Sequence, residues 1–285
     1  MMNLTVYGQT DLGLVRKTNE DAFSIVDLTS GDAIAEQTFV TFPAGERGVL
    51  LAVSDGMGGA AAGDVASAMV IASVRRSMMT PAHTASVSLV EEATEQANLA
   101  VWTAARQPGR AGMGATLTAL HLHGTIADIA EIGDSRAYLL RGGTLEQVTR
   151  DQSYVQVLID AGKLTEEQAA NSSLQHVISQ AMGQKPEVSV ALGRIELRQY
   201  DCLILCSDGL SNEVSADEMR QVILDAPRLD AACTHLVDLA KQRGGKDNIT
   251  LLLCGVFGDL QPLMAGETAE DALQIIKEPP TPSFT

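Results

Sequence analysis

Short apolar runs that end at glycine mark the buried strands of this chain. The runs "GVLLAV" and "DCLILC" are each followed by Ser-Asp-Gly, at residues 54–56 and 207–209. A short apolar run bounded by glycine is typical of a strand buried on both faces. Residues 115–149 hold several further β segments separated by glycines, and this spacing predicts an antiparallel meander.

Helical patterns lie between these β segments. Apolar residues recur with a helical period at residues 61–79, 86–107, 215–225 and 228–243. Strands and helices therefore come in blocks, not in strict alternation. This arrangement predicts an α+β fold, with antiparallel sheets and helical pairs packed outside them. It argues against a doubly wound parallel sheet.

Two segments depart from this regular pattern. Residues 150–185 are polar and predict an excursion from the sheets, and a long excursion of this kind is often functional. After the last strand pattern, "NITLLLCGVF", residues 259–285 end in "KEPPTPSFT" and predict a flexible C-terminal tail. We therefore expect one domain over residues 1–258.

Net charge and cysteine content indicate which partners and which cellular compartment to expect. Lys and Arg total 20 and Asp and Glu total 36, so the net charge is −16, which argues against nucleic-acid and anionic-membrane partners. The N-terminus lacks the pattern of a signal peptide, and no apolar run is long enough to span a bilayer. The four cysteines form no C-x-x-C pair, which suits a reducing compartment. We expect a cytoplasmic protein.

Acidic residues at the ends of β segments are the candidate chemistry. A single Asp-Gly is most simply a turn. Here, however, six acids lie beside β segments: Glu20, Asp21, Asp55, Asp134, Asp208 and Asp247. If they converge, they remain ionised only with bound cations, and all-oxygen ligation favours Mg²⁺ or Mn²⁺. Two such ions about 3.5–4 Å apart can activate water against a phosphate ester.

Six motifs in order give the chain a resemblance to a known family. They are "RKTNED", "SDGMGG", "GMGATL", "GDSRAY", "SDGL" and "GGKDNIT". Together they resemble the metal-dependent Ser/Thr protein phosphatases of type 2C (the PPM family), in the compact bacterial form. The resemblance implies a sandwich of two antiparallel sheets flanked by helical pairs, with a dinuclear metal centre at one edge and a flap at about 150–185.

The resemblance also implies a ligand set for Mn²⁺ or Mg²⁺. Asp55 would bridge two ions, the carbonyl of Gly56 would serve the second ion, and Asp208 with Asp247 would complete the first. A third, weaker ion would lie between Asp134 and Asp208.

Other matched positions would act around these ions. Glu20 and Asp21 would hold metal-bound waters, and Arg16 would clamp the substrate phosphate with its planar guanidinium. A metal-bridging hydroxide would then attack phosphorus in line with the leaving Ser or Thr oxygen.

One departure concerns the general acid. Ala60 stands where many bacterial relatives carry a histidine, so a metal-bound water protonates the leaving oxygen, another side chain substitutes, or turnover is slow. His176, in the flap, is the substitute to test, against the simpler interpretation of a surface or packing residue. His121 and His123, two residues apart on a strand, share one side and could mimic a metal pair. We interpret them instead as a solvated strand face, since the acids already account for the ions.

The sequence thus predicts a monomeric Ser/Thr phosphatase that opposes a Ser/Thr kinase and acts on phosphorylated proteins, including that kinase and its substrates. The alternative is a catalytically weak pseudophosphatase that binds phosphoproteins or kinases. A metal phosphodiesterase or nuclease is disfavoured by the acidic surface.

Overall fold

Strands with two apolar faces build the centre of the molecule. In β4 (Val49–Met57), Leu51 and Val53 face one hydrophobic core, whereas Leu50 and Ala52 face another. Successive side chains of a strand point to opposite sides. A continuous apolar run therefore requires an apolar layer on each side of the sheet, as the sequence predicted for β4.

The computed structural model describes residues 1–58, 62–80, 86–165, 168–169, 172, 174 and 177–279. Within them one sheet has the strand order β3-β1-β12-β11-β8-β9. Its strands are β1 (Met2–Asp11), β3 (Val40–Pro43), β8 (Arg136–Arg141), β9 (Thr144–Gln147), β11 (Cys202–Cys206) and β12 (Ile249–Gly258).

The second sheet has the order β13-β10-β7-β6-β4-β2, and the short β5 (Gly114–Ala115) pairs with β4. Its other strands are β2 (Asp21–Asp27), β6 (Leu117–His123), β7 (Ile126–Ile132), β10 (Ala191–Glu196) and β13 (Leu273–Lys277). Within each of the two sheets, neighbouring strands pair in the antiparallel direction.

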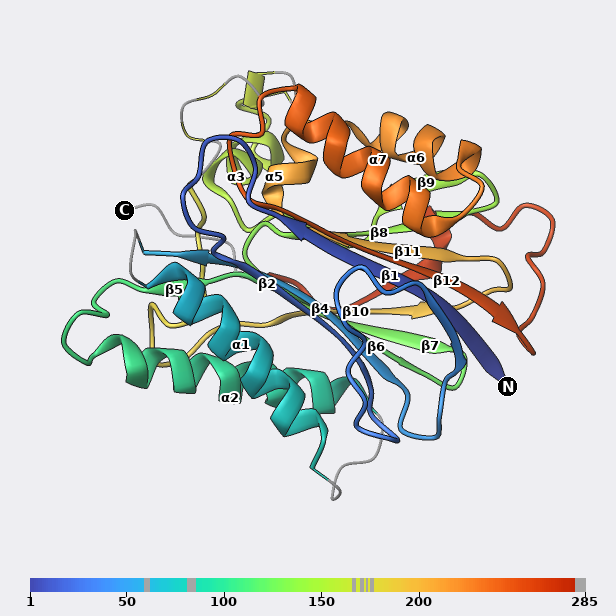
Figure 1. The fold of residues 1–285 in the computed structure, drawn as a ribbon, viewed down its shortest axis with the longest axis horizontal. Helices are drawn as coiled ribbons and strands as arrows, with labels where there is room; N and C mark the ends of the chain where they lie inside the picture. Colours follow the sequence, from blue (N-terminus) through green and yellow to red (C-terminus); the bar gives the residue numbers. More distant parts are fainter. Residues whose placement is uncertain are drawn as a thin grey trace.

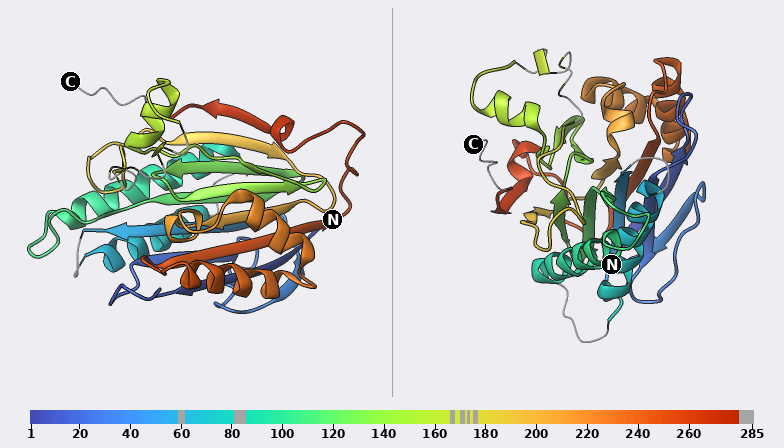
Figure 2. Two further views of the ribbon diagram at one scale, coloured as in Figure 1. Left: turned by 90° about the horizontal axis from the view of Figure 1, so that it is seen from above. Right: turned by 90° about the vertical axis from the view of Figure 1, so that its left-hand side faces the viewer.

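Helical pairs cover the outer faces of the two sheets (Figures 1 and 2). One pair, α1 (Gly63–Met78) and α2 (Val87–Ala105), packs on the second sheet, and α6 (Ala216–Asp225) with α7 (Leu229–Gln242) packs on the first. The shorter helices are α3 (Tyr154–Asp160), α5 (Asp208–Ser211) and η1 (Glu270–Ala272). The α/β/β/α layers and the four long helices confirm the predicted fold class.

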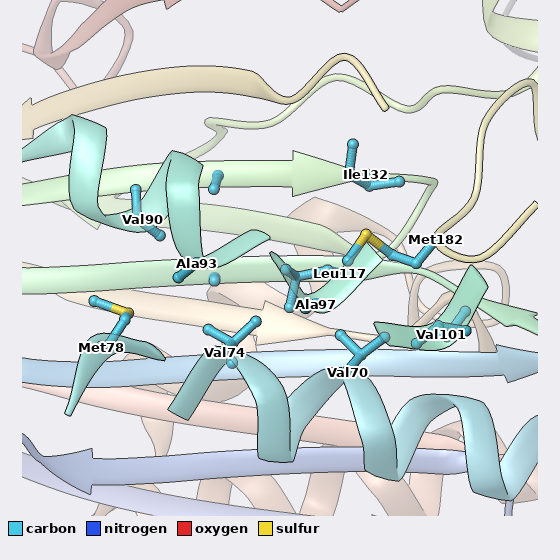
Figure 3. Packing of buried hydrophobic residues seen from close by; sticks show 14 of the residues in the cluster. Val70, Val74, Met78, Val90, Ala93, Ala97, Val101, Leu117, Ile132 and Met182 are labelled. Atoms are coloured by element: carbon cyan, nitrogen blue, oxygen red, sulfur yellow. The ribbon is translucent and has the colours of Figure 1, made fainter. Parts of the chain in front are cut away.

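The helices are held by side chains at helical spacing. Val70, Val74 and Met78 of α1 meet Val90 and Ala97 of α2 over the sheet (Figure 3). All of these residues are fully buried. Burial of such side chains contributes about 1.5–3 kcal/mol for each large one, so this interface anchors the helix pair and the strand ends beneath it.

The predicted meander was wrong at one point. β6 pairs with β7 and β8 pairs with β9, but β7 and β8 belong to different sheets. The chain crosses between the sheets through Gly133 and Asp134. Gly133 has φ +106°, and a Cβ there would lie 2.6 Å from the Thr116 side chain. Local spacing of β segments cannot distinguish this crossing from a hairpin.

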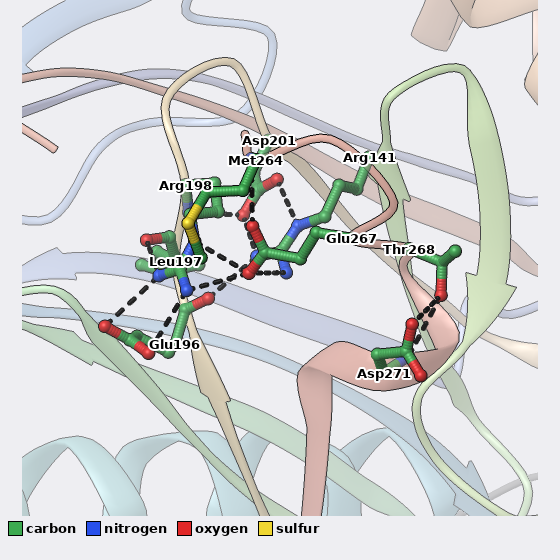
Figure 4. Close-up of polar contacts among 9 residues, drawn as sticks. All are labelled: Arg141, Glu196, Leu197, Arg198, Asp201, Met264, Glu267, Thr268 and Asp271. Carbon is green, nitrogen blue, oxygen red and sulfur yellow. Dashed lines mark hydrogen bonds and ion pairs between the residues drawn. The ribbon is translucent and has the colours of Figure 1, made fainter. Parts of the chain in front are cut away.

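The flexible tail predicted for 259–285 was also wrong for its described part. β13 pairs with β10, and Ala269 is fully buried. Arg198 donates from Nε to Glu267 Oε1 at 2.9 Å (Figure 4), and Lys277 pairs with Glu91. Prolines end regular structure locally, but pairing with an open sheet edge ordered the segment before them. Residues 280–285 lie outside the described residues.

Two further predictions concern the cysteines and the excursion. Cys202 and Cys206 share β11, and all four cysteines are buried free thiols. The chain from β9 to β10 leaves the sheets and forms α3, as expected of the 150–185 segment. Across the described residues, no helix is long and apolar enough to cross a membrane.

Candidate functional site

A cavity of about 450 Å³ opens at one edge of the sandwich. Seven of the residues singled out from the sequence line it: Arg16, Glu20, Asp55, Gly56, Asp134, Asp208 and Asp247. They come from five separate segments of the chain. The convergence that the motifs alone left open is therefore present in the structure.

Asp55 and Gly56 lie at the end of β4. The Asp55 amide donates to Thr116 Oγ1 at 2.9 Å, and the Gly56 amide donates to the Glu20 carbonyl at 3.1 Å. A Cβ on Gly56 would lie 2.1 Å from the Gly63 carbonyl oxygen. Glycine is required here because the start of α1 approaches the strand closely.

The second Ser-Asp-Gly repeats this close approach. Asp208 is the first residue of α5, directly after β11, and its Oδ2 accepts from Asn212 Nδ2 at 3.1 Å. A Cβ on Gly209 would lie 2.0 Å from the Asn248 carbonyl oxygen. Each glycine thus lets a neighbouring segment close on the cavity wall.

Asp134 lies on the crossing between the sheets. The adjacent Ser135 Oγ is 2.7 Å from Thr116 Oγ1, and Ser135 O accepts from Thr118 Oγ1 at 2.6 Å. Thr116 Oγ1 also accepts from the Asp55 amide. The hydroxyls of Thr116 and Ser135 therefore fix Asp55 and Asp134 relative to each other. Sequence reasoning missed Thr116 and Ser135, although they lie inside the quoted motifs "GMGATL" and "GDSRAY".

Arg16 is held at the rim by Asp247. Its Nη2 lies 2.7 Å from Asp247 Oδ2, and its side chain is 48% exposed. Asn248 Oδ1 accepts from the Glu20 amide at 2.8 Å, while its Nδ2 donates to the carbonyls of Leu12 and Thr18. Asn248 therefore anchors the "RKTNED" loop, a role that its position beside Asp247 only hinted at.

Asp21 stands behind the cavity wall. Its Oδ2 accepts from the hydroxyls of Ser207 and Thr250, each at 2.7 Å. Its Oδ1 is buried and has no hydrogen-bond partner among the described residues. An unsatisfied buried carboxylate oxygen costs free energy, which a water or cation beside it would recover.

The carboxyl groups perturb one another strongly. Desolvation, followed by repulsion from Asp21 and Asp208, raises the pKa of Asp55 well above its usual value. Desolvation also raises the pKa of Asp134 well above the usual value and that of Asp21 to about 7. Divalent cations relieve this repulsion, and the all-oxygen donor set suits Mg²⁺ or Mn²⁺. The residues present therefore fit such ions.

Three more residues bear on the chemistry of the cavity: Ala60, His176 and Lys246. Ala60 and His176 lie outside the described residues. Lys246, which the motifs did not single out, lines the cavity and pairs with Glu213 at 3.3 Å. Its signal was its place directly before Asp247. With Arg16, it gives the cavity lining two cations, which favour an anionic ligand.

The interpretation of His121 and His123 as a solvated strand face was wrong. His121 is fully buried, and His123 Nε2 lies 2.8 Å from Asp128 Oδ2. Their strand face is covered because it continues the surface on which α1 and α2 pack. They lie at the end of β6 remote from Asp55.

The chain is similar in sequence to known protein phosphatases. The family model of protein phosphatase 2C matches residues 19–250. The Ser/Thr protein phosphatase PstP of Mycobacterium tuberculosis is 36% identical over 272 residues, covering 94% of this chain and 48% of that protein. This chain thus spans about half of that relative's length.

Two further matches cover nearly the full length of the proteins that this chain resembles. A putative protein phosphatase 2C-type of Streptococcus pyogenes is 33% identical over 248 residues, covering 86% of this chain and 94% of that protein. A crystal structure of the PstP catalytic domain in complex with two manganese ions has a TM-score of 0.75 at 34% identity, covering 90% of this chain and 100% of that one.

Proposed function

The chain belongs to the protein phosphatase 2C family, and from this premise we propose that it hydrolyses phosphoserine and phosphothreonine esters on proteins. The observation that supports this most is the meeting of Asp55, Asp208 and Asp247 with Arg16 around one cavity. A nuclease would bind polyanionic nucleic acid, and the net charge of −16 opposes such a substrate.

The proposed metal ligands follow the lining of the cavity. Asp55, the Gly56 carbonyl, Asp208 and Asp247 would hold two Mn²⁺ or Mg²⁺ ions, and Asp134 with Asp208 would hold a third. Glu20 and Asp21 would hold hydrating water, for which the unpartnered Asp21 Oδ1 offers an acceptor. When bound, the ions supply an activated water and neutralise charge on the phosphoryl group.

The chain's own residues bind and orient the substrate. Arg16 releases Asp247 and presents two parallel N–H donors to the phosphate oxygens, where it stabilises charge that grows in the transition state. Lys246 adds a mobile cation at the rim, since its side chain is 76% exposed. The hydroxyls of Thr116 and Ser135 keep Asp55 and Asp134 fixed while the phosphoryl group transfers.

The leaving oxygen takes up a proton, which a general acid supplies. We propose His176 as its donor, because Ala60 cannot supply one. If His176 is the general acid, His176→Ala removes the alkaline limb of the pH–rate profile on a phosphopeptide and slows turnover by about 100-fold. An unchanged profile would assign the proton to water instead.

The biological setting is also part of the proposal. The enzyme acts as a monomer in the cytoplasm, where a reducing environment suits its four buried free thiols. Its partners are phosphorylated proteins, including a Ser/Thr kinase that it opposes and that kinase's substrates. The catalytic unit expected for residues 1–258 is extended by β13 on its second sheet, and residues 150–185 form the flap beside the substrate.

Phosphate release from a phosphothreonine peptide tests the function. We expect wild-type protein to release phosphate in Mn²⁺ or Mg²⁺ and to be silent in chelator. Asp208→Asn should abolish release, because it removes a ligand charge from the cavity. The matched control is Asp238→Asn, the same change on the exposed face of α7, which should leave activity unchanged.

Two outcomes would contradict the proposal. A folded wild type that releases no phosphate from phosphoprotein in either metal would refute hydrolysis and support the binding-only alternative. Equal activity in wild type and Asp208→Asn would instead remove the cavity from the chemistry. The circular dichroism spectrum of each variant shows whether a loss of activity reflects unfolding.

A further inference from the structure

A second cluster of potential metal ligands lies far from the catalytic cavity. It consists of His121 and His123 on β6 and Asp128 on β7, and one potential ligand atom of each lies within 4.8 Å of the others. His121 pairs in register with Leu50, five residues before Asp55 on β4. At about 3.3 Å per residue, the cluster is about 17 Å along the sheet from Asp55.

The strand register explains why the three side chains meet. His121 and His123 are two positions apart, so both project from the same face of the sheet. Asp128 is the direct cross-strand partner of His121. The two imidazole rings lie side by side with centroids 4.7 Å apart.

His121 presents an orphaned ligand atom. Its Nε2 lies 2.9 Å from the Arg47 carbonyl oxygen, which accepts a hydrogen bond and therefore places the ring proton on Nε2. The other nitrogen, Nδ1, carries a lone pair, is buried, and has no partner among the described residues. Metal-ligating histidines commonly donate their second nitrogen to a backbone carbonyl in this way.

Asp128 is oriented in a similar manner. Its carboxylate is fully buried, and Oδ1 accepts from Arg194 Nε at 2.6 Å, while Oδ2 lies 2.8 Å from His123 Nε2. Arg194 fixes one oxygen and leaves the other directed toward the imidazoles. A carboxylate held by a second group on its outer oxygen is typical of the support behind metal ligands.

We propose that His121, His123 and Asp128 bind a transition-metal dication of the Zn²⁺ type, separate from the ions of the catalytic cavity. Two imidazoles and one carboxylate select Zn²⁺ and its neighbours, whereas Mg²⁺ prefers oxygen alone. Binding replaces the hydrogen bond between His123 Nε2 and Asp128 Oδ2 with bonds from both side chains to the ion. The ion then ties β6 to β7 and, through His121, to the residues that precede β4.

Zinc content in the presence of excess Mg²⁺ tests this site. The Mg²⁺ occupies the oxygen ligands of the catalytic cavity, and the protein is dialysed against Zn²⁺-free buffer after loading. We expect about one zinc per chain in the wild type and none in His123→Ala. His235→Ala removes an exposed histidine of α7 and is the matched control, which should keep the zinc.

Thermal unfolding provides a second measurement that does not depend on catalysis. Zn²⁺ added over Mg²⁺ should raise the Tm of the wild type and of Asp208→Asn, because the ion binds the folded state, and should leave His123→Ala unchanged. Equal zinc content in wild type and His123→Ala, or no zinc in the wild type, would overturn the proposal.

The design also covers a variant that fails to fold. If His123→Ala unfolds in Mg²⁺ alone, Co²⁺ is titrated into the wild type with the catalytic cavity filled by Mg²⁺. Visible absorption bands of a nitrogen-ligated Co²⁺ centre are expected at one equivalent. Their absence would refute the site, and phosphatase activity does not enter either measurement.

Discussion

Asp21 and Asp55 are direct cross-strand partners on β2 and β4, so the carboxylate that lines the catalytic cavity has a second one beside it, behind the cavity wall. Like charges in this position destabilise a sheet. Desolvation, followed by repulsion from Asp21 and Asp208, raises the pKa of Asp55. Desolvation, with added repulsion from Asp208 and Asp247, raises the pKa of Asp21. The arrangement is stable with both groups ionised only when cations share the cavity, so the pair links folding to metal binding.

Asp21→Asn separates these two effects. The amide oxygen still accepts from Ser207 and Thr250, but the charge is gone. We expect a higher Tm than the wild type in chelator, and a metal requirement for half-maximal activity that is about 10-fold higher or more. Thermal unfolding and metal titrations of activity measure the two, with Asp238→Asn as control. An unchanged metal requirement would show that Asp21 plays no part in holding the ions.

Arg16→Lys tests phosphate binding at the rim. Lysine keeps the charge but loses the planar fork, and hydrogen bonds to charged groups contribute about 1.5–3 kcal/mol. We therefore expect kcat/KM on a phosphothreonine peptide to fall by about 10-fold to 100-fold, with metal affinity retained. Arg228→Lys makes the same change at the N-terminal end of α7 and should be neutral. Equal loss in both variants would argue against a role in phosphate binding.

Thr116→Val tests the hydroxyl link between Asp55 and Asp134. Valine has the same shape but leaves the Asp55 amide without an acceptor, which costs about 1–3 kcal/mol of unfolding free energy. We also expect weaker metal binding, because Asp55 is released. Thr118→Val removes a neighbouring buried hydroxyl that donates to Ser135 O. It should lower stability in urea unfolding without a comparable change in metal affinity; the same metal affinity in both variants would contradict the link.

Glu131 makes stability depend on pH. It is 3% exposed, its Oε1 has no partner among the described residues, and desolvation raises its pKa well above the usual value. The folded state therefore binds this proton more tightly than the unfolded state. The stability it contributes is complete below the unfolded pKa and is lost as pH rises toward the folded pKa.

Glu131→Gln removes this proton uptake. Relative to wild type, its unfolding free energy should grow by about 1.4 kcal/mol per pH unit above about pH 4.5, until the folded pKa is passed. Urea unfolding at several pH values, with metal present throughout, measures the difference. Glu95→Gln, on the exposed side of α2, should show none. A difference independent of pH would mean that Glu131 is not the titrating group.

Much of the fold was readable because each strand and helix carries its own pattern. The apolar runs before Asp55 and Asp208 predicted β4 and β11, and helical periodicity located the four long helices closely. The acids and Arg16 were found because they stand beside these elements in motifs with a shared order. Local chemistry of this kind is written in neighbouring residues.

Other features depended on partners distant in the chain. The crossing at Asp134, the pairing of β13 with β10, and the roles of Thr116 and Asn248 each join segments that no local pattern connects. His121 and His123 looked like a surface pair until the covering of their sheet face was known.

The sequence by itself determined the helices, the buried strands, the class of metal ligands and the family resemblance. Only the tertiary structure decided which carboxylates share one cavity and at which glycines another backbone segment approaches closely. It also decided that His121 and His123 lie beside Asp128, far from that cavity. The physical reason is that periodicity and motif spacing report on neighbouring residues. Desolvation, repulsion and unpartnered polar atoms arise only when separate segments pack together.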